Sequence, residues 1–223
     1  MKILALETST EACSVALWTD GSIIERFEVG SQHSERILPM VHDVLAEAGF
    51  TLVQLDAIAF GRGPGSFTGL RISAGVVQGL AFGADLPVVP VSSLAVLAQG
   101  VDAPKVLAAF DARLNQVYWG AYIRNAQGIA ELSGIERVLT PKNIPVPVDA
   151  GWTGAGSGWD QYSQTLMERF KDHVLEWRAQ CFPRARFVAR LGALQHAQGG
   201  ALTAEQALPV YLRDEIASKQ LKR

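Results

Sequence analysis

The sequence predicts an α/β fold built from two similar halves. Each half opens with β-prone runs separated by short turns, and segments with helical apolar periodicity follow in each half. Between residues 56 and 91, a predicted strand, a helix and a second strand succeed one another. That order indicates a parallel crossover. We therefore expect two α/β subdomains, residues 1–100 and residues 101–223.

The first half begins with a predicted three-stranded meander. Its β-prone runs cover residues 3–6, 13–18 and 23–29, and polar or glycine-containing turns separate them. The second half repeats this arrangement at residues 107–111, 117–123 and 129–132. A shift of 104 residues places Asp111 on Glu7 and Tyr122 on Trp18. The agreement in pattern predicts a duplicated subdomain.

Two helices are predicted between the meanders. The first begins around Ser34 and stops at Gly49, and Pro39 requires either a start near Arg36 or a kink. The second covers residues 69–83, and further helices are expected at 162–170 and 187–197. The apolar positions on one face of the first helix are Ile37, Val41, Val44, Leu45 and Ala48.

Glycines on the second helix form a stripe with one cation. Gly75, Gly79 and Gly83 recur every four residues, and Arg71 lies one turn earlier. Each interior glycine costs about 0.8–1 kcal/mol relative to alanine, so the stripe indicates close approach of another backbone. That backbone belongs either to the chain's own sheet or to a partner protein. With the apolar stripe of the first helix, it predicts a helix-based partner interface.

Composition excludes several classes of protein. Hydrophobic residues make up 48% of the chain and charged residues 19%, which supports a large core. The net charge of −2 excludes a strongly basic nucleic-acid binder. Cys13 and Cys181 are far apart, and no signal peptide or membrane span is visible. We expect a cytoplasmic protein that does not contact a membrane.

The segment from Gly63 to Arg71 is the most distinctive local motif. It reads Gly-Pro-Gly-Ser-Phe-Thr-Gly-Leu-Arg and runs into a helix, so it is either a tight turn or an anion-binding loop. It lacks the lysine of a phosphate-binding P-loop, and Ser66 lacks the flanking glycines of a nucleophile elbow. Both enzyme classes are therefore disfavoured.

Other candidate residues carry weaker signals. Glu7 and Asp111 end equivalent strands and either orient a metal or water, or cap the strands. The four histidines form no metal-binding spacing. Basic residues that either contact RNA or face solvent are Arg184, Arg186, Arg190, Lys219, Lys222 and Arg223.

Several motifs together resemble the bacterial TsaB family, also called YeaZ, over nearly the full chain. They are residues 1–10, residues 33–39 (His-Ser-Glu-Arg-Ile-Leu-Pro), residues 63–72, Asp111-Ala112-Arg113 and Tyr211-Leu212-Arg213. The resemblance implies the actin, sugar kinase and heat-shock ATPase (ASKHA) fold, with two duplicated subdomains that each begin with a β-meander. It implies a non-catalytic subunit of the machinery that makes N6-threonylcarbamoyladenosine at position 37 of tRNAs reading ANN codons.

The family's partners follow from the same resemblance. They are a TsaD-type catalytic subunit and a TsaE-type ATPase, with tRNA bound through the complex and a homodimer formed in their absence. The expected partner interface comprises Ile37, Val41, Val44, Leu45, Arg71, Gly75, Gly79 and Gly83. We expect no cofactor on this chain alone, and ATP, ADP and metal on the partner subunits.

The chain departs from the catalytic paralogue where that family binds metal. Ser93 and Leu97 stand at the expected histidine positions, and leucine offers no ligand atom. The superfamily's phosphate loops also lack their glycines here. A degenerate nucleotide cleft would comprise Glu7, Thr8, Ser9, Asp111, Gly154 and Gly156. The alternative functions are a peptidase acting on the TsaD-type partner, and a nucleotide-binding protein, hydrolase or kinase of the same fold.

Overall fold

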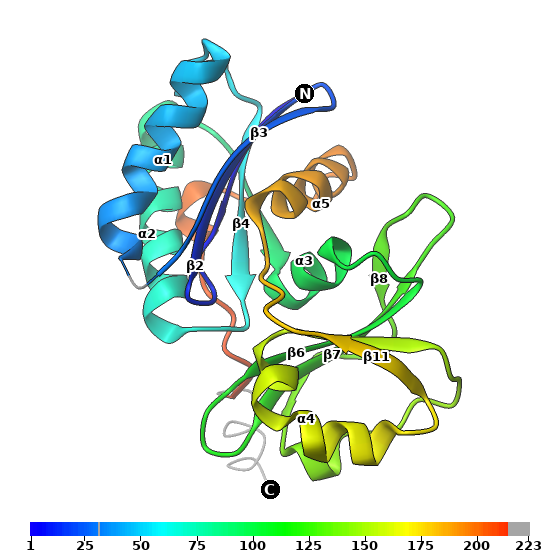
Figure 1. Ribbon diagram of the computed structural model, residues 1–223. Coiled ribbons are helices and arrows are strands. Elements are labelled where there is room, and N and C mark those ends of the chain that lie inside the picture. The colour runs from blue at the N-terminus through cyan, green and yellow to red at the C-terminus, as the bar shows by residue number, and fades with distance from the viewer. Residues whose placement is uncertain (31, 214–223) are drawn as a thin grey trace, which may run out of the picture. The chain divides into compact units, whose positions relative to one another are not determined.

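The computed structural model describes residues 1–30 and 32–213 (Figure 1). The chain divides into two compact units. Unit 1 comprises Met1–Val96 and Pro183–Val210, and unit 2 comprises Leu97–Phe182 and the segment that begins at Tyr211. The expected boundary at residue 100 lies near this division. The expectation that everything after it belongs to the second subdomain is corrected, because a late helix packs on the sheet of unit 1.

Unit 1 is a five-stranded sheet with helices on both faces. Its strand order is β3-β2-β1-β4-β5, with β2 antiparallel to β1 and β3, and β4 parallel to β1 and β5. The strands are β1 (Lys2–Glu7), β2 (Ala12–Thr19), β3 (Ser22–Val29), β4 (Ala57–Gly63) and β5 (Val88–Ser92). The helices are α1 (His33–Ala48), α2 (Phe67–Ala84), α3 (Ser93–Gly100), which runs from unit 1 into unit 2, and α5 (Ala185–Ala197), with 3-10 turns at Leu52–Gln54 and Ala204–Gln206.

The side chains of β1 point alternately to the two faces of the sheet, which explains why helices cover both faces. Leu4 and Leu6 face the core that α1 and α2 cover, while Ile3 and Ala5 face the core that α5 covers. Figure 1 shows α1 and α2 on one side of the sheet and α5 on the other. All four β1 side chains are completely buried, as expected for a strand inside a two-sided sheet.

Helix α1 contains a proline in its interior. It starts at His33, one residue before the predicted Ser34, so Pro39 lies inside the helix rather than in its first turn, and the alternative start near Arg36 is excluded. Pro39 is exposed, so the Glu35 carbonyl oxygen, which loses its helical partner there, can bond to water. Gly49 ends the helix in the left-handed conformation with φ of 70°, as predicted.

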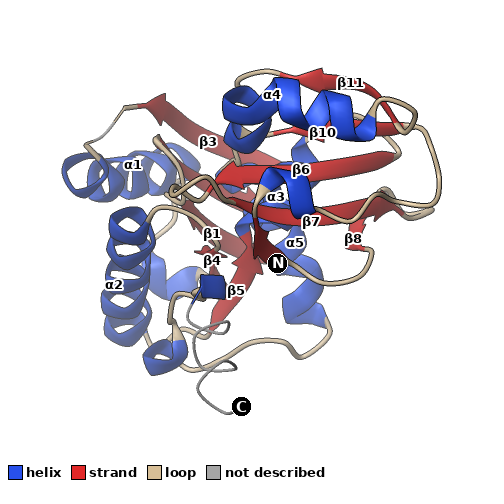
Figure 2. Ribbon diagram, turned by 90° about the horizontal axis from the view of Figure 1, so that it is seen from below, coloured by secondary structure: helices blue, strands red, loops and turns tan. Residues whose placement is uncertain are grey.

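Unit 2 contains a six-stranded sheet covered on one face by α4 (Figure 2). Its main strand order is β11-β10-β6-β7-β8, and β9 pairs with β7. The strands are β6 (Lys105–Asp111), β7 (Val117–Arg124), β8 (Ala130–Leu132), β9 (Arg137–Leu139), β10 (Trp152–Ala155) and β11 (Val174–Arg178). Helix α4 spans Ser157–Phe170, and a 3-10 turn spans Pro141–Asn143.

The two units share one topology. Strands β6, β7 and β8 form an antiparallel meander like β1, β2 and β3, and β10 and β11 run parallel to β6 as β4 and β5 run parallel to β1. Glu7 ends β1 and Asp111 ends β6, the residues that the 104-residue shift superimposes. The predicted ASKHA-like duplication is confirmed.

Candidate functional site

Glu7, the first candidate residue of the nucleotide cleft, is completely buried. Its carboxylate accepts hydrogen bonds from the Ser9 amide at 2.6 Å and from the Ser93 hydroxyl at 3.0 Å. Burial raises the pKa of Glu7 above its usual 4.5, although these hydrogen bonds act in the opposite direction. Ser93, at a position where the resemblance to the catalytic paralogue expects histidine, therefore holds a buried acid.

A glycine in the neighbouring strand makes room for this acid. A Cβ atom at Gly61 of β4 would overlap the Glu7 carboxylate. The carboxylate therefore lies in a notch inside the sheet of unit 1. In this position Glu7 stabilises the end of β1 and offers no exposed oxygen to a metal or water.

The Gly63–Arg71 motif closes over the turn that follows Glu7. The Ser66 amide donates to the Ser9 carbonyl at 2.7 Å, and the Thr8 hydroxyl donates to the Gly69 carbonyl at 2.8 Å. Cβ atoms at Gly65 and Gly69 would overlap the carbonyl oxygens of Ser9 and Thr8. Two of the motif's glycines are thus required for backbone contact inside unit 1.

The start of α2 also forms hydrogen bonds within unit 1. Ser66 is the N-cap, and its hydroxyl accepts from the Gly69 amide at 3.3 Å. The structure therefore favours the tight-turn interpretation of this motif over the anion-binding one. Thr8 and Ser9 are both buried beneath it, so the β1–β2 turn presents its backbone to the protein rather than to a phosphate.

In unit 2, Asp111 has a different environment. Its side chain is 17% exposed and pairs with Arg113, whose Nη1 lies 3.3 Å from Oδ2. Oδ1 accepts from the Arg113 amide at 2.9 Å and from the Tyr162 hydroxyl at 3.4 Å. Burial, followed by the negative charge of Asp111, raises the pKa of Tyr162.

The two candidate glycines of unit 2 serve helix packing. A Cβ at Gly154 would lie 2.5 Å from the Trp159 indole, whose Nε1 donates to the Leu107 carbonyl at 2.8 Å. Gly156 has φ of 99° and would overlap the Ala109 carbonyl oxygen. Trp159 is completely buried, so α4 itself occupies the space beside Gly154 and Gly156.

The predicted partner interface is corrected on α1. Ile37, Val41, Val44 and Leu45 are buried in the core of unit 1, where they pack with β1, β2 and β4. An apolar stripe at helical spacing predicts that one face of the helix is buried, but it does not tell whether that face packs on the chain's own sheet or on a partner protein. In this structure the face packs on the chain's own sheet.

The glycine stripe of α2 is exposed. Cβ atoms at Gly75, Gly79 and Gly83 would meet nothing within 4 Å, so no described part of the chain approaches these glycines. Arg71 is also exposed, and its guanidinium lies 3.6 Å from the centre of the Phe67 ring. The structure excludes the interpretation that the stripe packs on the chain's own sheet.

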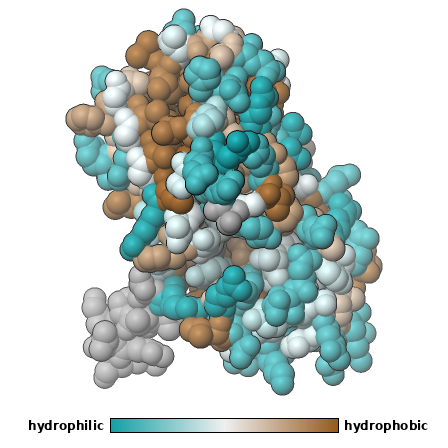
Figure 3. All heavy atoms as spheres, turned by 60° about the vertical axis from the view of Figure 1, so that its left-hand side comes forward, coloured by the Kyte–Doolittle hydropathy of each residue, from teal (hydrophilic) through white to brown (hydrophobic). Residues whose placement is uncertain are grey.

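Apolar side chains that the sequence analysis did not select share this side of unit 1. Phe82 is 76% exposed and Phe67 54% exposed, both on α2, and Leu38 on α1 is half exposed. Figure 3 brings the side with α1 and α2 forward and shows apolar side chains gathered on unit 1. The sequence could have indicated the exposure of these three side chains, because they lie outside the helical stripes that are buried in the core.

Two arginines considered for RNA contact are bound to an acid. Arg184 Nη2 and Arg186 Nε lie 2.6 Å and 2.8 Å from Glu25 Oε2, and the Glu25 side chain is only 3% exposed. The two ion pairs therefore connect the start of α5 to β3. Arg190 also has an interaction partner, while Lys219, Lys222 and Arg223 lie outside the described residues.

The part of the chain that the structure describes contains neither a cluster of metal ligands nor a membrane-spanning helix. Within residues 1–30 and 32–213, no group of three or more histidine, cysteine or acidic side chains is placed to hold a metal ion. No helix in that part of the chain is long and apolar enough to cross a bilayer.

The geometry defines the class of protein. It is a duplicated ASKHA-like α/β protein in which the Gly63–Arg71 motif covers Thr8 and Ser9 of unit 1, and Trp159 of α4 packs against Gly154 of unit 2. A family described as "TsaD: tRNA N6-adenosine threonylcarbamoyltransferase" matches residues 27–219.

Relatives of known name define the family of this chain more narrowly. "tRNA threonylcarbamoyladenosine biosynthesis protein TsaB" of Escherichia coli is 42% identical, covering 99% of this chain and 98% of that protein. The protein of the same name from Haemophilus influenzae is 40% identical over 99% and 97%. The solved structure of YeaZ from Pseudomonas aeruginosa is 50% identical, covers 95% and 99%, and has a TM-score of 0.87. The chain belongs to the TsaB family.

Proposed function

We propose that this protein is a non-catalytic, partner-binding subunit required for threonylcarbamoyl transfer to adenosine 37 of tRNAs that read ANN codons. Family membership supports the pathway, since the curated relatives are named for threonylcarbamoyladenosine biosynthesis. The non-catalytic role is supported by the buried Glu7 and by the packing of Trp159 against Gly154. Nucleotide and metal are then supplied by the partner subunits.

The exposed glycine stripe of α2 is the observation that carries the proposal. Interior glycines weaken a helix, and nothing in the described chain requires them at positions 75, 79 and 83. Small residues permit close contact between helix backbones. The stripe therefore fits a helix of another protein, and the exposed Phe67 and Phe82 add apolar area beside it.

The TsaD-type subunit is the proposed partner, and the match of this chain to the TsaD family gives that subunit a related fold. A surface that fits a related subunit also fits a second copy of itself, so the same face of α2 is proposed to form an isologous homodimer when the partner is absent. A TsaE-type ATPase and tRNA would join through the assembled complex.

The test is reconstitution with mutated α2 surfaces. Gly79→Leu and Arg71→Glu should abolish heterodimer formation in gel filtration, and transfer to unmodified tRNA should fall to the level seen without this subunit. Gln164→Leu, which places the same apolar side chain at an exposed position of α4, is the matched control and should leave both unchanged. Wild-type assembly by both α2 variants would overturn the interface, and transfer by this chain alone would overturn the non-catalytic role.

Gly79→Ala separates partner binding from folding. Because its Cβ meets open space, the variant should raise the free energy of unfolding of the isolated protein by about 0.8–1 kcal/mol. It should also weaken the heterodimer, since the methyl group occupies the contact. Urea denaturation and calorimetric titration measure the two effects, and a variant that is more stable yet binds equally well would contradict the proposed close contact.

A further inference from the structure

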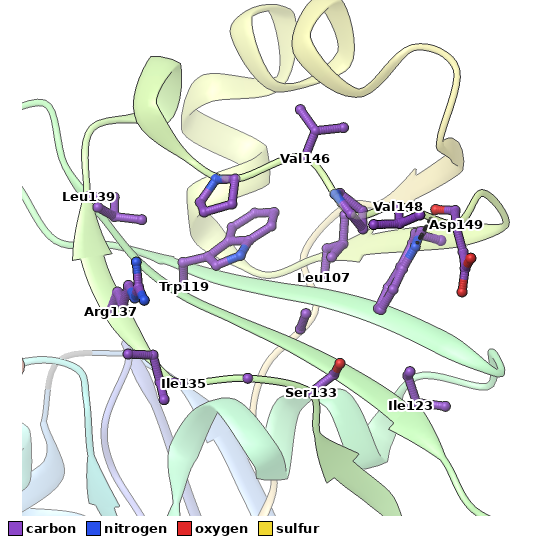
Figure 4. A pocket seen from close by; sticks show the side chains of 15 residues that line it. Leu107, Trp119, Ile123, Ser133, Ile135, Arg137, Leu139, Val146, Val148 and Asp149 are labelled. Carbon is purple, nitrogen blue, oxygen red and sulfur yellow. Dashed lines mark hydrogen bonds between the residues drawn. The ribbon is translucent and has the colours of Figure 1, made fainter.

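A groove in unit 2 lies outside every surface described so far. It is a cavity of about 370 Å³, within the usual size range for ligand sites (Figure 4). Its floor is one face of the sheet, formed by Leu107 of β6, by Trp119 and Ala121 of β7, and by Trp152 of β10. Trp119 also packs with Trp159 and Phe170 of α4, so the groove is the part of this sheet face that α4 leaves open.

Two loops form the walls, and both expose apolar side chains. Ile135 on one wall is 61% exposed, and Val148 on the other is 97% exposed. Pro145 and Pro147 flank Val146 on the second wall. Each proline fixes its own φ and has no amide to donate, so this wall is stiff and offers few backbone donors to a ligand. Recognition here must depend mainly on side chains.

The charges around the groove favour an acidic ligand. Arg137 lines one end, and its guanidinium has no ion pair or hydrogen bond to any described residue. At the other end Asp149 is already paired with Lys105, whose Nζ lies 3.4 Å from Oδ2. The charge left without a partner is therefore positive. Figure 4 shows Arg137 and Asp149 at opposite ends of the cavity.

The exposure of the walls distinguishes a peptide from a small molecule. A compound enclosed in the cavity would leave most of Val148 and Ile135 in water, because these side chains stand on the rim. A polypeptide segment that crosses the groove can cover both rims and also place side chains on the tryptophan floor. The stiff proline wall lowers the entropy lost when such a segment binds.

We propose that this groove is a docking site for a segment of a partner protein that carries apolar side chains and one acidic side chain opposite Arg137. The site belongs entirely to unit 2, whereas the α2 surface belongs to unit 1. It therefore gives the subunit a second binding surface that does not depend on the proposed α2 interface.

A displayed library of random twelve-residue peptides, selected on the immobilised full-length protein, tests the proposal. Selected sequences should share large apolar residues and one aspartate or glutamate. A synthetic peptide of the selected sequence should bind at least tenfold more weakly to Ala121→Phe, which fills the floor, and to Arg137→Glu. Arg113→Glu, which changes another exposed arginine of unit 2 outside the groove, is the matched control and should bind like the wild type.

A charge reversal makes the test specific. A peptide in which lysine replaces the acidic residue should bind Arg137→Glu more tightly than the wild type. Selection of basic or purely polar peptides, or binding that survives Ala121→Phe, would overturn the proposal. Sedimentation showing that Val148→Ser dissolves a homodimer would assign the groove to a second copy and would overturn it too.

Discussion

The β1–β2 turn of unit 1 and the β6–β7 turn of unit 2 come at equivalent places in the same strand order but differ in how they are held. Residues 8–11 contain no left-handed residue, and the Gly63–Arg71 motif covers Thr8 and Ser9. Arg113, Leu114 and Asn115 all have positive φ, and the side chains of Arg113 and Leu114 are highly exposed. Asp111 and Arg213 hold this second turn, Arg213 by donating to the Ala112 carbonyl at 2.7 Å.

The difference shows how two copies of one fold can hold the same turn in two ways. In unit 1 Thr8 and Ser9 are buried under a loop whose glycines permit backbone contact, so the first half of the turn belongs to the protein interior. In unit 2 the turn stays at the surface in a conformation that costs L-residues about 1–2 kcal/mol each. Added side-chain atoms at the first turn should therefore lower the free energy of unfolding. Removal of a side chain from a left-handed residue of the second turn should raise it.

The largest effect should come from the covered turn. Gly69→Ala forces a methyl group onto the Thr8 carbonyl oxygen, and overpacking of this kind typically costs 1–3 kcal/mol, so we expect a loss of about 3 kcal/mol in the free energy of unfolding. Urea denaturation measures it. Gly75→Ala, on the open face of the same helix, should be stabilising. If the two variants had equal stability, the close contact in unit 1 would be disproved.

A pH dependence should mark the buried acid of unit 1. Burial raises the pKa of Glu7 in the folded protein, so the unfolded chain loses this proton first as pH rises. The free energy of unfolding should therefore fall from about pH 4.5 up to the raised pKa, by at most about 1.4 kcal/mol per pH unit.

Glu7→Gln tests the assignment of that slope. The neutral amide should remove the Glu7 contribution from stability curves measured between pH 4 and pH 8. Glu35→Gln, at an exposed position of α1, should leave the slope in place. Identical pH profiles for the wild type and Glu7→Gln would show that the buried carboxyl does not titrate as described.

The smallest effect should come from the exposed turn of unit 2. Leu114→Gly relieves a left-handed residue whose side chain is 78% exposed, at the cost of the greater freedom of glycine in the unfolded chain. We expect a net stabilisation of about 0.5–1 kcal/mol by thermal denaturation. Leu132→Gly, in strand β8, should instead destabilise the protein. A loss of stability in Leu114→Gly would show that the side chain does more than strain the turn.

Most of the fold could be predicted from the sequence because its signals are local and periodic. The two meanders, the crossover through α2 and the stop at Gly49 agree with the structure. Strands β10 and β11 were missed because they are only four and five residues long and lie in a region of turns. The place of α5 was missed because no local pattern tells a helix which of two sheets it covers.

The candidate site was harder to predict than the fold. The sequence identified Glu7 and the glycine motif, but the motif contacts Thr8 and Ser9, which lie about 60 positions away along the chain. Periodicity marked Ile37 and Gly79 equally as interface residues, although the first is buried and the second exposed. The groove of unit 2 has no sequence signal, because its floor and walls come from separate strands and loops.

The discontinuity of unit 1 has a consequence for synthesis on the ribosome. Its sheet is complete when Ser92 has been made, but α5, which covers Ile3 and Ala5, ends at Ala197, about 100 residues later. At 5–20 residues per second this interval is roughly 5–20 s. Most of unit 2 is synthesised in that interval. The sheet face that contains Ile3 and Ala5 therefore has no helix to cover it until the inserted unit has been made.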